Sequence, residues 1–455
     1  MTAWMTAAET AAQVAGGGLT CQEAVQAALD RIALAAPINA FTDVLAERAL
    51  GRAAAQDAGG PRGPLAGVPF AVKNLFDVEG LPTRAGSRIN RECPPAAADA
   101  AAVQRLERAG AILVGTLNMG EYAYDFTGEN THDGACRNPH DPLRMAGGSS
   151  SGSGAAVAAG VVPVALGSDT NGSIRVPASL CGVFGLKPTY GRLSRAGTFP
   201  FVSSLDHIGP LARSAEDLAL FYHAMLGPDP DDPVCTGRGA GPEAPAEVPG
   251  LRIAVAGGHF QANAGPEALA ALDQVATALG ATAQVELPEA ARARAAAYVI
   301  TTVEGAALHL GRLRTRPGDF DPDVRDRLIA GAMVPGAFYV QAQRFRRWYQ
   351  RQVLALFRDW DAILAPATPC TAPLIGCKTM ELGGETLPVR AMLGVLTQPI
   401  SFIGLPVVAV PVPMPGLPIA VQVIAPPWQE ATALRIARHL EAQGVARAPR
   451  PANQG

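Results

Sequence analysis

The stretch GGSSSGS at residues 147–153 is followed by GSDTNGSIR at residues 167–175. Glycine, serine and proline dominate residues 146–197, yet apolar segments such as VVPVAL at residues 161–166 keep returning. A flexible linker would lack such apolar runs, which are typical of buried strands. We therefore interpret this region as a series of tight loops between the elements of a folded sheet.

Helices and short apolar strands alternate on either side of this region. Before it, Gly63 to Lys73 predicts a proline turn that leads into an apolar strand ending on a lysine. After it, residues 290–360 are predicted to be mostly helical. Alternation of this kind favours an α/β fold with helices on both faces of a sheet. The other elements that we expect are helices within residues 1–35, 101–108 and 429–442, and strands at 111–114, 161–166, 183–186, 251–256, 362–366 and 407–411.

The composition of the 455 residues excludes several classes of protein. Only 17% of the residues are charged, which argues against disorder, and a formal net charge of −3 offers no surface for a polyanion such as nucleic acid. Seven scattered cysteines without metal-ligand spacing predict neither a disulfide framework nor a metal site. The start MTAWM lacks a secretory signal, and no apolar run reaches about 18 residues, so we expect a cytoplasmic protein without a membrane-spanning helix.

A serine nucleophile is the chemistry that these motifs suggest. A serine hydroxyl is a poor nucleophile until a base takes its proton. Histidine is the usual base, but none of the seven histidines lies in the motifs. A lysine can replace it where burial lowers its pKa, because desolvation disfavours the charged form. Lys73 ends an apolar strand, where we expect such burial.

Each motif also has a plainer interpretation. Gly/Ser-rich stretches are usually ordinary loops, and a single lysine at a strand end is usually solvated. GSSSG at residues 148–152 also fits the nucleophile elbow of α/β-hydrolases, with Ser150 as nucleophile. That fold needs a strand directly before the elbow, whereas we predict a turn from Asn138 to Pro142, so we reject it. Three segments occur together and in this order: the strand that ends at Lys73, GGSSSGS at residues 147–153 and GSDTNGSIR at residues 167–175. Their joint presence favours a catalytic role.

The three segments, with residues 167–175 continuing as VPASLCGVFGLKPT to Thr189, resemble the amidase signature family over nearly the whole chain. The resemblance implies an α/β amidase-signature fold, in which a mixed central β-sheet is covered by helices on both faces. It also implies hydrolysis of a C–N amide bond through an acyl-enzyme, without a cofactor or a metal. Residues 118–142 and 169–182 most resemble the branch of the family that acts on carboxybiuret in cyanuric acid (s-triazine) breakdown.

The resemblance assigns a catalytic triad. Ser173 would be the nucleophile, Ser149 the bridging serine and Lys73 the base. The proton would pass from Ser173 to Ser149 and on to Lys73, and would later reach the leaving nitrogen. The bridging serine is expected to follow a cis peptide bond between Gly148 and Ser149.

The loop before the nucleophile is implied to stabilise the oxyanion. Asp169 and Arg175 would support this loop through a buried ion pair, without direct chemistry. Asn171 and Ser151 stand where the family usually has glycine, and neither departure removes a catalytic group. The oxyanion hole would be formed by backbone N–H groups of Thr170, Asn171, Gly172 and Ser173.

A small ureido substrate of the carboxybiuret type, releasing ammonia, is the activity that the closer likeness implies. Tyr124, Asp125 and Thr127 precede the bridging loop and are candidate pocket residues, although Asp125 is awkward beside an anionic substrate. No arginine is assigned to a substrate carboxylate. Glutamine is disfavoured, because the arginine and aspartate that bind it in related amidotransferases have no counterparts in residues 372–376 and 392–397. Two alternatives stay open: a broad aliphatic or aryl amidase, and a non-catalytic amidase-like assembly subunit.

We expect one amidase domain over residues 1–455. Within it, residues 65–215 would form the signature core, 227–250 a surface excursion and 251–455 a second lobe that completes the sheet. The resemblance further implies homodimerisation of the assembly and a small helical accessory subunit, with no nucleic-acid or membrane partner. Arg344, Arg346 and Arg347 are interpreted as a solvated helix face or a partner contact.

Overall fold

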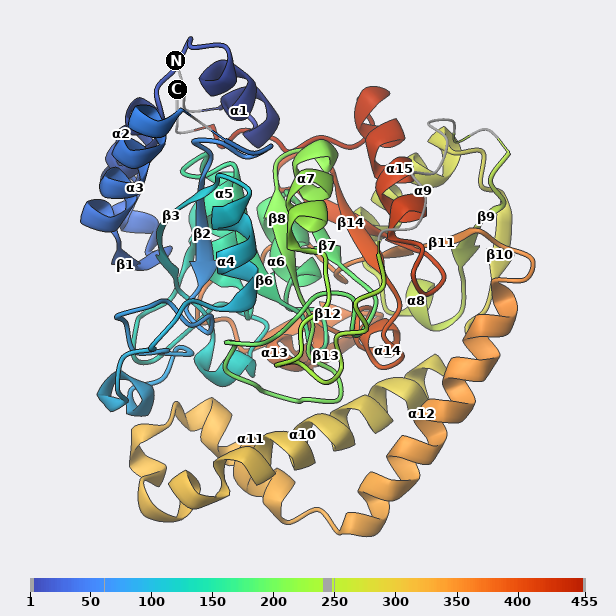
Figure 1. The fold of residues 1–455 in the computed structure, drawn as a ribbon. Helices are drawn as coiled ribbons and strands as arrows, with labels where there is room; N and C mark the ends of the chain where they lie inside the picture. Colours follow the sequence, from blue (N-terminus) through green and yellow to red (C-terminus); the bar gives the residue numbers. More distant parts are fainter. Residues whose placement is uncertain (1–3, 61, 240–247, 249, 453–455) are drawn as a thin grey trace.

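A mixed sheet of eleven strands runs through the computed structural model, which describes residues 4–60, 62–239, 248 and 250–452 (Figure 1). Parallel pairs occur at two places, around β2 (Pro69–Lys73) and around β9 (Ile253–Ala256), and the remaining pairs are antiparallel. The mixed sheet of the prediction is therefore confirmed. In sheet order the strands are β1 (Phe41–Val44), β3 (Ile112–Leu117), β2 (Pro69–Lys73), β6 (Val164–Ser168), β8 (Ile208–Ala212), β7 (Phe184–Lys187), β14 (Val407–Val412), β15 (Ile419–Ile424), β11 (Ala362–Pro366), β9 (Ile253–Ala256) and β10 (Ala283–Val285).

Helices cover both faces of this sheet, as the sequence predicts. In β2, Phe70 and Val72 belong to one buried apolar cluster and Ala71 to another, because successive side chains of a strand point to opposite faces. The first face packs against α4 (Ala101–Arg108), α7 (Ala215–Met225), α9 (Pro266–Ala278) and α15 (Glu430–Ala442). The second face packs against α2 (Cys21–Leu34), α3 (Ala46–Gly59), α5 (Ser151–Ala158) and α6 (Arg175–Cys181).

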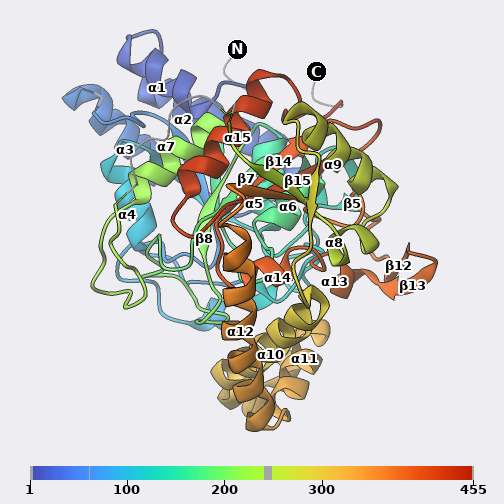
Figure 2. The same cartoon turned by 90° about the vertical axis from the view of Figure 1, so that its right-hand side faces the viewer.

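Three helices form an arm that projects from the body of the molecule: α10 (Ala290–Thr315), α11 (Pro322–Ala332) and α12 (Gly336–Leu356) (Figure 2). Arg346 of α12 donates to the backbone oxygens of Phe402, at 2.6 Å, and Ser204, at 2.8 Å, so this arginine does not belong to a solvated face. Arg344 and Arg347 are exposed. The remaining helices are α1 (Ala7–Ala15), α8 (His259–Ala262), α13 (Val389–Met392) and α14 (Gln398–Ser401).

The expected turn between Asn138 and Pro142 is present, since Pro139 and His140 form a turn between two short strands. These residues lie within a small hairpin of β4 (Arg137–Asn138) and β5 (Asp141–Met145), so a strand does precede the Gly/Ser loop. That strand is separate from the central sheet, whereas a nucleophile elbow follows a strand of the main sheet. The rejection of the elbow therefore stands on a different ground from the one that the sequence suggested. A second hairpin pairs β12 (Thr379–Leu382) with β13 (Glu385–Pro388).

Residues 227–239 carry no helix or strand, and residues 240–247 and 249 of the expected surface excursion lie outside the described residues, as do residues 1–3 of the chain start. Among the helices that the structure describes, none combines the length and the apolar character that crossing a membrane requires.

Candidate active site

The carboxyl ends of two neighbouring parallel strands bring the first polar groups together. Strands β2 and β6 pair in the register Val72 to Leu166, so Lys73 and Ser168 emerge at the same edge of the sheet. Lys73 Nζ lies 2.8 Å from Ser168 Oγ. Strand pairing therefore places a lysine and a hydroxyl side by side although they are far apart in the sequence.

The loop before α5 contributes a second hydroxyl. Lys73 Nζ lies 2.7 Å from Ser149 Oγ, and both side chains are fully buried. The peptide bond between Gly148 and Ser149 is cis, as the family resemblance implies. Ser150 points elsewhere, because its hydroxyl donates to the backbone oxygen of Ser168 at 3.2 Å. Of the loop serines, Ser149 is thus the one in contact with the lysine.

Burial dominates the electrostatics of Lys73. Desolvation of its ammonium group lowers the pKa of Lys73 from 10.5 to about 7, against the opposing pull of Asp206, Asp169 and Asp125. A large fraction of Lys73 is therefore neutral near pH 7 and able to accept a proton. A neutral amine in contact with a serine hydroxyl is a competent base.

The loop of residues 169–174 lies against the loop of Ser149. The Ser150 amide donates to the Ser173 backbone oxygen at 3.3 Å, and the Thr397 hydroxyl donates to the Asn171 backbone oxygen at 2.7 Å. Gly172 has a φ of 141°, and a Cβ atom there would overlap with Thr397 Oγ1. Only glycine therefore fits this position with Thr397 in place.

The backbone N–H groups of this loop are available to a ligand. In the part of the chain that the structure describes, no acceptor takes a hydrogen bond from the amide of residue 170, 171, 172 or 173. The Asn171 side chain is oriented by its Nδ2 atom, which donates to Thr301 Oγ1 at 2.9 Å. Amides without an acceptor, next to a serine hydroxyl, are donors that can stabilise an oxyanion.

A buried ion pair lies beneath the loop. Arg175 donates to both oxygens of Asp169 at 3.0 Å, and neither side chain is exposed. Arg175 also donates to Gln422 Oε1 at 2.6 Å, and the Ile174 amide donates to Asp169 at 3.3 Å. Despite burial, the Arg175 guanidinium holds the pKa of Asp169 well below its usual range. The pair connects the two ends of the loop, which agrees with a supporting role.

A cavity of about 650 Å³ opens onto this centre. Of the residues predicted for the site, Tyr124, Asp125, Thr170, Asn171 and Ser173 line it. Lys73 and Ser149 lie behind this wall, fully buried. Thr127, also predicted for the site, contacts Asp125 instead, because its hydroxyl donates to Asp125 Oδ1 at 2.9 Å.

Asp125 is not a free negative charge in this cavity. Its second oxygen accepts the backbone amides of Thr127, at 2.9 Å, and Gly128, at 2.6 Å. Arg390 lies 2.7 Å from Oδ1 as its counter-ion. The conflict between Asp125 and an anionic ligand, which the sequence suggests, is therefore removed by Arg390.

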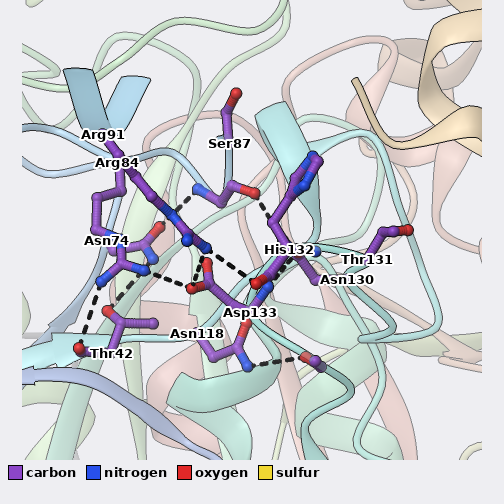
Figure 3. Close-up of polar contacts among 12 residues, drawn as sticks. Thr42, Asn74, Arg84, Ser87, Arg91, Asn118, Asn130, Thr131, His132 and Asp133 are labelled. Atoms are coloured by element: carbon purple, nitrogen blue, oxygen red, sulfur yellow. Dashed lines mark hydrogen bonds and ion pairs between the residues drawn. The ribbon is translucent and has the colours of Figure 1, made fainter. Parts of the chain in front are cut away.

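A polar network holds the segment that carries Tyr124 and Asp125 (Figure 3). Arg84 and Arg91 converge on Asp133, at 2.5 and 2.8 Å. Asn130 donates to the backbone oxygens of Gly86 and Met119, both at 2.8 Å, and Asn118 donates to Gly134 at 3.2 Å. This network closes the segment from residue 118 to 134 on itself and fixes the cavity wall that it supplies.

Several side chains at the site were not predicted. Ser168 is the last residue of β6 and the second residue of the GSDTNGS stretch, and it could have been suspected from that position. The others come from distant segments and carry no motif of their own, so only their place in the fold identifies them. They are Arg294, Thr301, Arg327, Arg390 and Thr397.

Residues 23–434 match the protein family described as Amidase. The chain is 57% identical to AtzE of Pseudomonas sp. (strain ADP), a 1-carboxybiuret hydrolase subunit, covering 95% of this chain and 97% of that protein. It is 38% identical to one subunit of the glutamyl-tRNA(Gln) amidotransferase of Roseiflexus castenholzii (strain DSM 13941 / HLO8), covering 95% and 94%.

One solved structure superposes on this chain with a TM-score of 0.96 and 55% identity, covering 98% of this chain and 100% of the other. It is described as an inhibitor-bound form of a vestigial protein complex that reveals the evolutionary origins of an s-triazine catabolic enzyme. These similarities extend over the whole fold and include every segment that forms the cavity.

Proposed function

The chain belongs to the amidase family, whose members hydrolyse amide C–N bonds, and from this premise we propose that it cleaves a carboxybiuret-type substrate through a Ser173–Ser149–Lys73 triad. The single observation that carries the triad is the contact of 2.7 Å between Lys73 Nζ and Ser149 Oγ. It joins a buried lysine with a lowered pKa to a hydroxyl beside the nucleophile loop.

In the proposed reaction Ser173 attacks the terminal carbamoyl carbon. Its proton moves to Ser149 as the Ser149 proton moves to neutral Lys73, and the carbonyl oxygen becomes an oxyanion held by the amides of residues 170–173. The C–N bond then breaks, the proton returns through Ser149 to the leaving nitrogen, and ammonia departs. Water attacks the acyl-enzyme by the same route and frees the acid and Ser173.

The substrate class is proposed from the relative that is 57% identical, which is a 1-carboxybiuret hydrolase subunit. Carboxybiuret is a compact anion with several N–H and C=O groups. A cavity of about 650 Å³ with guanidinium groups and the hydroxyls of Thr170 and Tyr298 on its wall suits such a molecule. A non-catalytic assembly protein would have no need for a buried lysine in contact with a serine.

We further propose that residues 1–455 act as one amidase unit, since strands between residues 41 and 424 join in one sheet. The unit is proposed to bind a small helical accessory subunit, and the resulting assembly is proposed to dimerise. The description of the similar structure as a protein complex supports the accessory subunit. Light scattering of the purified chain, alone and after co-expression with a candidate small helical subunit, tests both expectations.

The experiment that tests the activity is ammonia release from freshly made carboxybiuret, set against biuret, glutamine and simple aliphatic and aryl amides. We expect the highest kcat/KM for carboxybiuret and none measurable after Ser173→Ala, with the variant folded by circular dichroism. Comparable kcat/KM for simple amides would support a broad amidase instead. Activity near wild type in Ser173→Ala would refute the triad.

A further inference from the structure

Three arginines line the cavity, and they differ in how their charges are balanced: Arg294, Arg327 and Arg390. Arg390 is neutralised, because it lies 2.7 Å from Asp125 and 3.1 Å from Asp323. A guanidinium group that is already paired with two carboxylates has little positive charge available to attract an anionic ligand. Arg390 is therefore a structural counter-ion of the cavity wall.

Arg294, on α10, has only neutral partners. It donates to Gln398 Oε1 at 3.0 Å and to the backbone oxygen of Ala391 at 2.8 Å. No carboxylate lies within ion-pair distance of it in the described part of the chain. Gln398 follows Thr397, whose hydroxyl holds the oxyanion loop, so Arg294 is connected to the reaction centre through one neighbouring residue.

Arg327, on α11, lines the same cavity and is likewise held by neutral oxygen atoms. It donates to the backbone oxygens of Asp323, at 2.7 Å, and of Tyr124. Its guanidinium carbon lies 3.9 Å from the centroid of the Tyr124 ring, which fixes the plane of the fork. Phe126 follows Tyr124 by two residues, and its backbone oxygen accepts a hydrogen bond from the Gly148 amide at 2.8 Å, next to the bridging serine. Among the described residues, no carboxylate forms an ion pair with Arg327.

Two guanidinium groups in one cavity that form no ion pair within the described part of the chain are costly for the protein without a ligand. Both side chains are partly buried, and this desolvation lowers the pKa of each. Both forks are held by neutral oxygens, so they are oriented without being neutralised. An anion bound in the cavity would supply the missing charge, and a planar carboxylate matches the geometry of a guanidinium fork.

We propose that Arg294 and Arg327 together form the subsite that binds the carboxylate of the substrate, and that Arg390 does not. The assignment rests on the proposed function, because it places the carboxylate of an anionic amide in the cavity of Ser173. The arm helices α10 and α11 supply both charges, while the body of the fold supplies the catalytic groups. Substrate charge is thus recognised by one part of the molecule and the amide is cleaved by another.

The test compares an anionic and an uncharged substrate in matched variants. We expect Arg294→Gln and Arg327→Gln each to lower kcat/KM for fresh carboxybiuret by about 10- to 100-fold, mainly through KM, because a charge-assisted hydrogen bond is lost. The kcat/KM for biuret, which lacks the carboxylate, should change less than about 3-fold. The rate at which an uncharged fluorophosphonate labels Ser173 should be unchanged and serves as a check that the triad is intact.

Each variant has a control two residues away on the same helix. Arg292 of α10 is exposed beside Glu289, and Arg325 of α11 pairs with Asp326; neither lines the cavity. Arg292→Gln and Arg325→Gln should leave the kcat/KM values for both substrates unchanged. An equal loss on carboxybiuret and biuret, or no loss on carboxybiuret, would overturn the proposal.

A further measurement separates this proposal from the proposed function. Malonate, a compact dicarboxylate, should slow fluorophosphonate labelling of the wild type and protect Arg294→Gln and Arg327→Gln at least about 10-fold less well. If the wild type releases no ammonia from carboxybiuret but malonate protects in this arginine-dependent way, the substrate assignment fails and the anion subsite stands. If malonate gives equal protection in wild type and variants, the subsite fails.

Discussion

The ammonium nitrogen of Lys73 lies 2.7 Å from the hydroxyl oxygen of Ser149 and 2.8 Å from that of Ser168, inside a fully buried centre. Two hydroxyls solvate the lysine, and no carboxylate forms an ion pair with it in the described part of the chain. Burial of the ammonium group is what lowers the pKa of Lys73, and the more distant carboxylates of Asp206, Asp169 and Asp125 offset this only in part.

The first prediction follows from that pKa. A base must be unprotonated to act, and Lys73 in the folded protein is unprotonated above its pKa of about 7. We expect kcat/KM to rise tenfold per pH unit below about 7 and to level off above it. Lys73→Met should remove activity at every pH.

Lys187 provides the control for this profile. It is also fully buried with its pKa lowered to about 7, but it donates to the Pro188 oxygen and does not line the cavity. Lys187→Met should retain the ascending limb near pH 7. Loss of that limb in Lys187→Met, with its persistence in Lys73→Met, would refute the assignment of the base.

The second prediction concerns the oxyanion loop. Gly172→Ala places a Cβ atom against Thr397 Oγ1 at a φ that alanine tolerates poorly, so the loop amides must shift. We expect kcat to fall on the order of 10²-fold, as for loss of one oxyanion donor. Gly311→Ala, on the exposed side of α10 with nothing within 4 Å, should keep wild-type kcat and gain roughly 0.5–1 kcal/mol in stability. Equal kcat in both variants would contradict this account.

The third prediction concerns the ion pair beneath the loop. Asp169→Asn leaves the fully buried Arg175 guanidinium without its counter-ion, which should lower the free energy of unfolding by about 3–5 kcal/mol. Asp361→Asn is the matched change in the largely exposed pair with Arg252, and should cost about 0–1 kcal/mol. Urea denaturation of both variants measures the difference. Similar losses would show that the buried pair has no special structural role.

The fourth prediction uses a buried histidine outside the active site. His309 has no hydrogen-bond partner for either ring nitrogen among the described residues, and its ring centroid lies 4.0 Å from that of Tyr122. Burial, with a smaller contribution from Arg312, lowers the pKa of His309 to about 3. Below about pH 6.5 the unfolded chain therefore binds a proton at His309, whereas the folded protein does not bind it until about pH 3. The free energy of unfolding therefore decreases as the pH is lowered from about 6.5 to about 3.

At pH 5 this proton should cost the wild type about 2 kcal/mol relative to pH 7.5. His309→Phe keeps the aromatic contact and should remove that part of the pH dependence, as measured by denaturant unfolding at both pH values. His223→Phe, at an exposed site, should leave the pH dependence as in the wild type. An unchanged slope in His309→Phe would contradict the prediction.

Much of the secondary structure was predictable from apolar patterning. The helix at 101–108 and the strands ending at Lys73 and Pro366 lie where the sequence places them. Strand β8 (Ile208–Ala212) was missed, because IGPLA combines glycine and proline with a run too short to signal a strand. It is nonetheless central, since it pairs with both β6 and β7.

The candidate active site was likewise predictable only in part. The order of the lysine, the Gly/Ser loop and the GSDTNGS loop is written in the sequence, since each loop needs small residues where its backbone turns tightly. These motifs carry the resemblance to the amidase family, and that resemblance predicted Lys73, Ser149 and Ser173 as a triad. They could not predict which arginines meet the cavity, because Arg294, Arg327 and Arg390 lie in segments without a motif.

The sequence by itself thus determined the glycine-rich loops and the apolar strands around them, and it predicted the histidine-free centre that we propose as catalytic. The tertiary structure decided how the charges are balanced: it pairs Asp125 with Arg390, and among the described residues it gives no carboxylate ion pair to Lys73, Arg294 or Arg327. The physical reason is that backbone conformation depends on neighbours in the chain. Charge balance depends on neighbours in space, which only the packing of the arm against the sheet brings together.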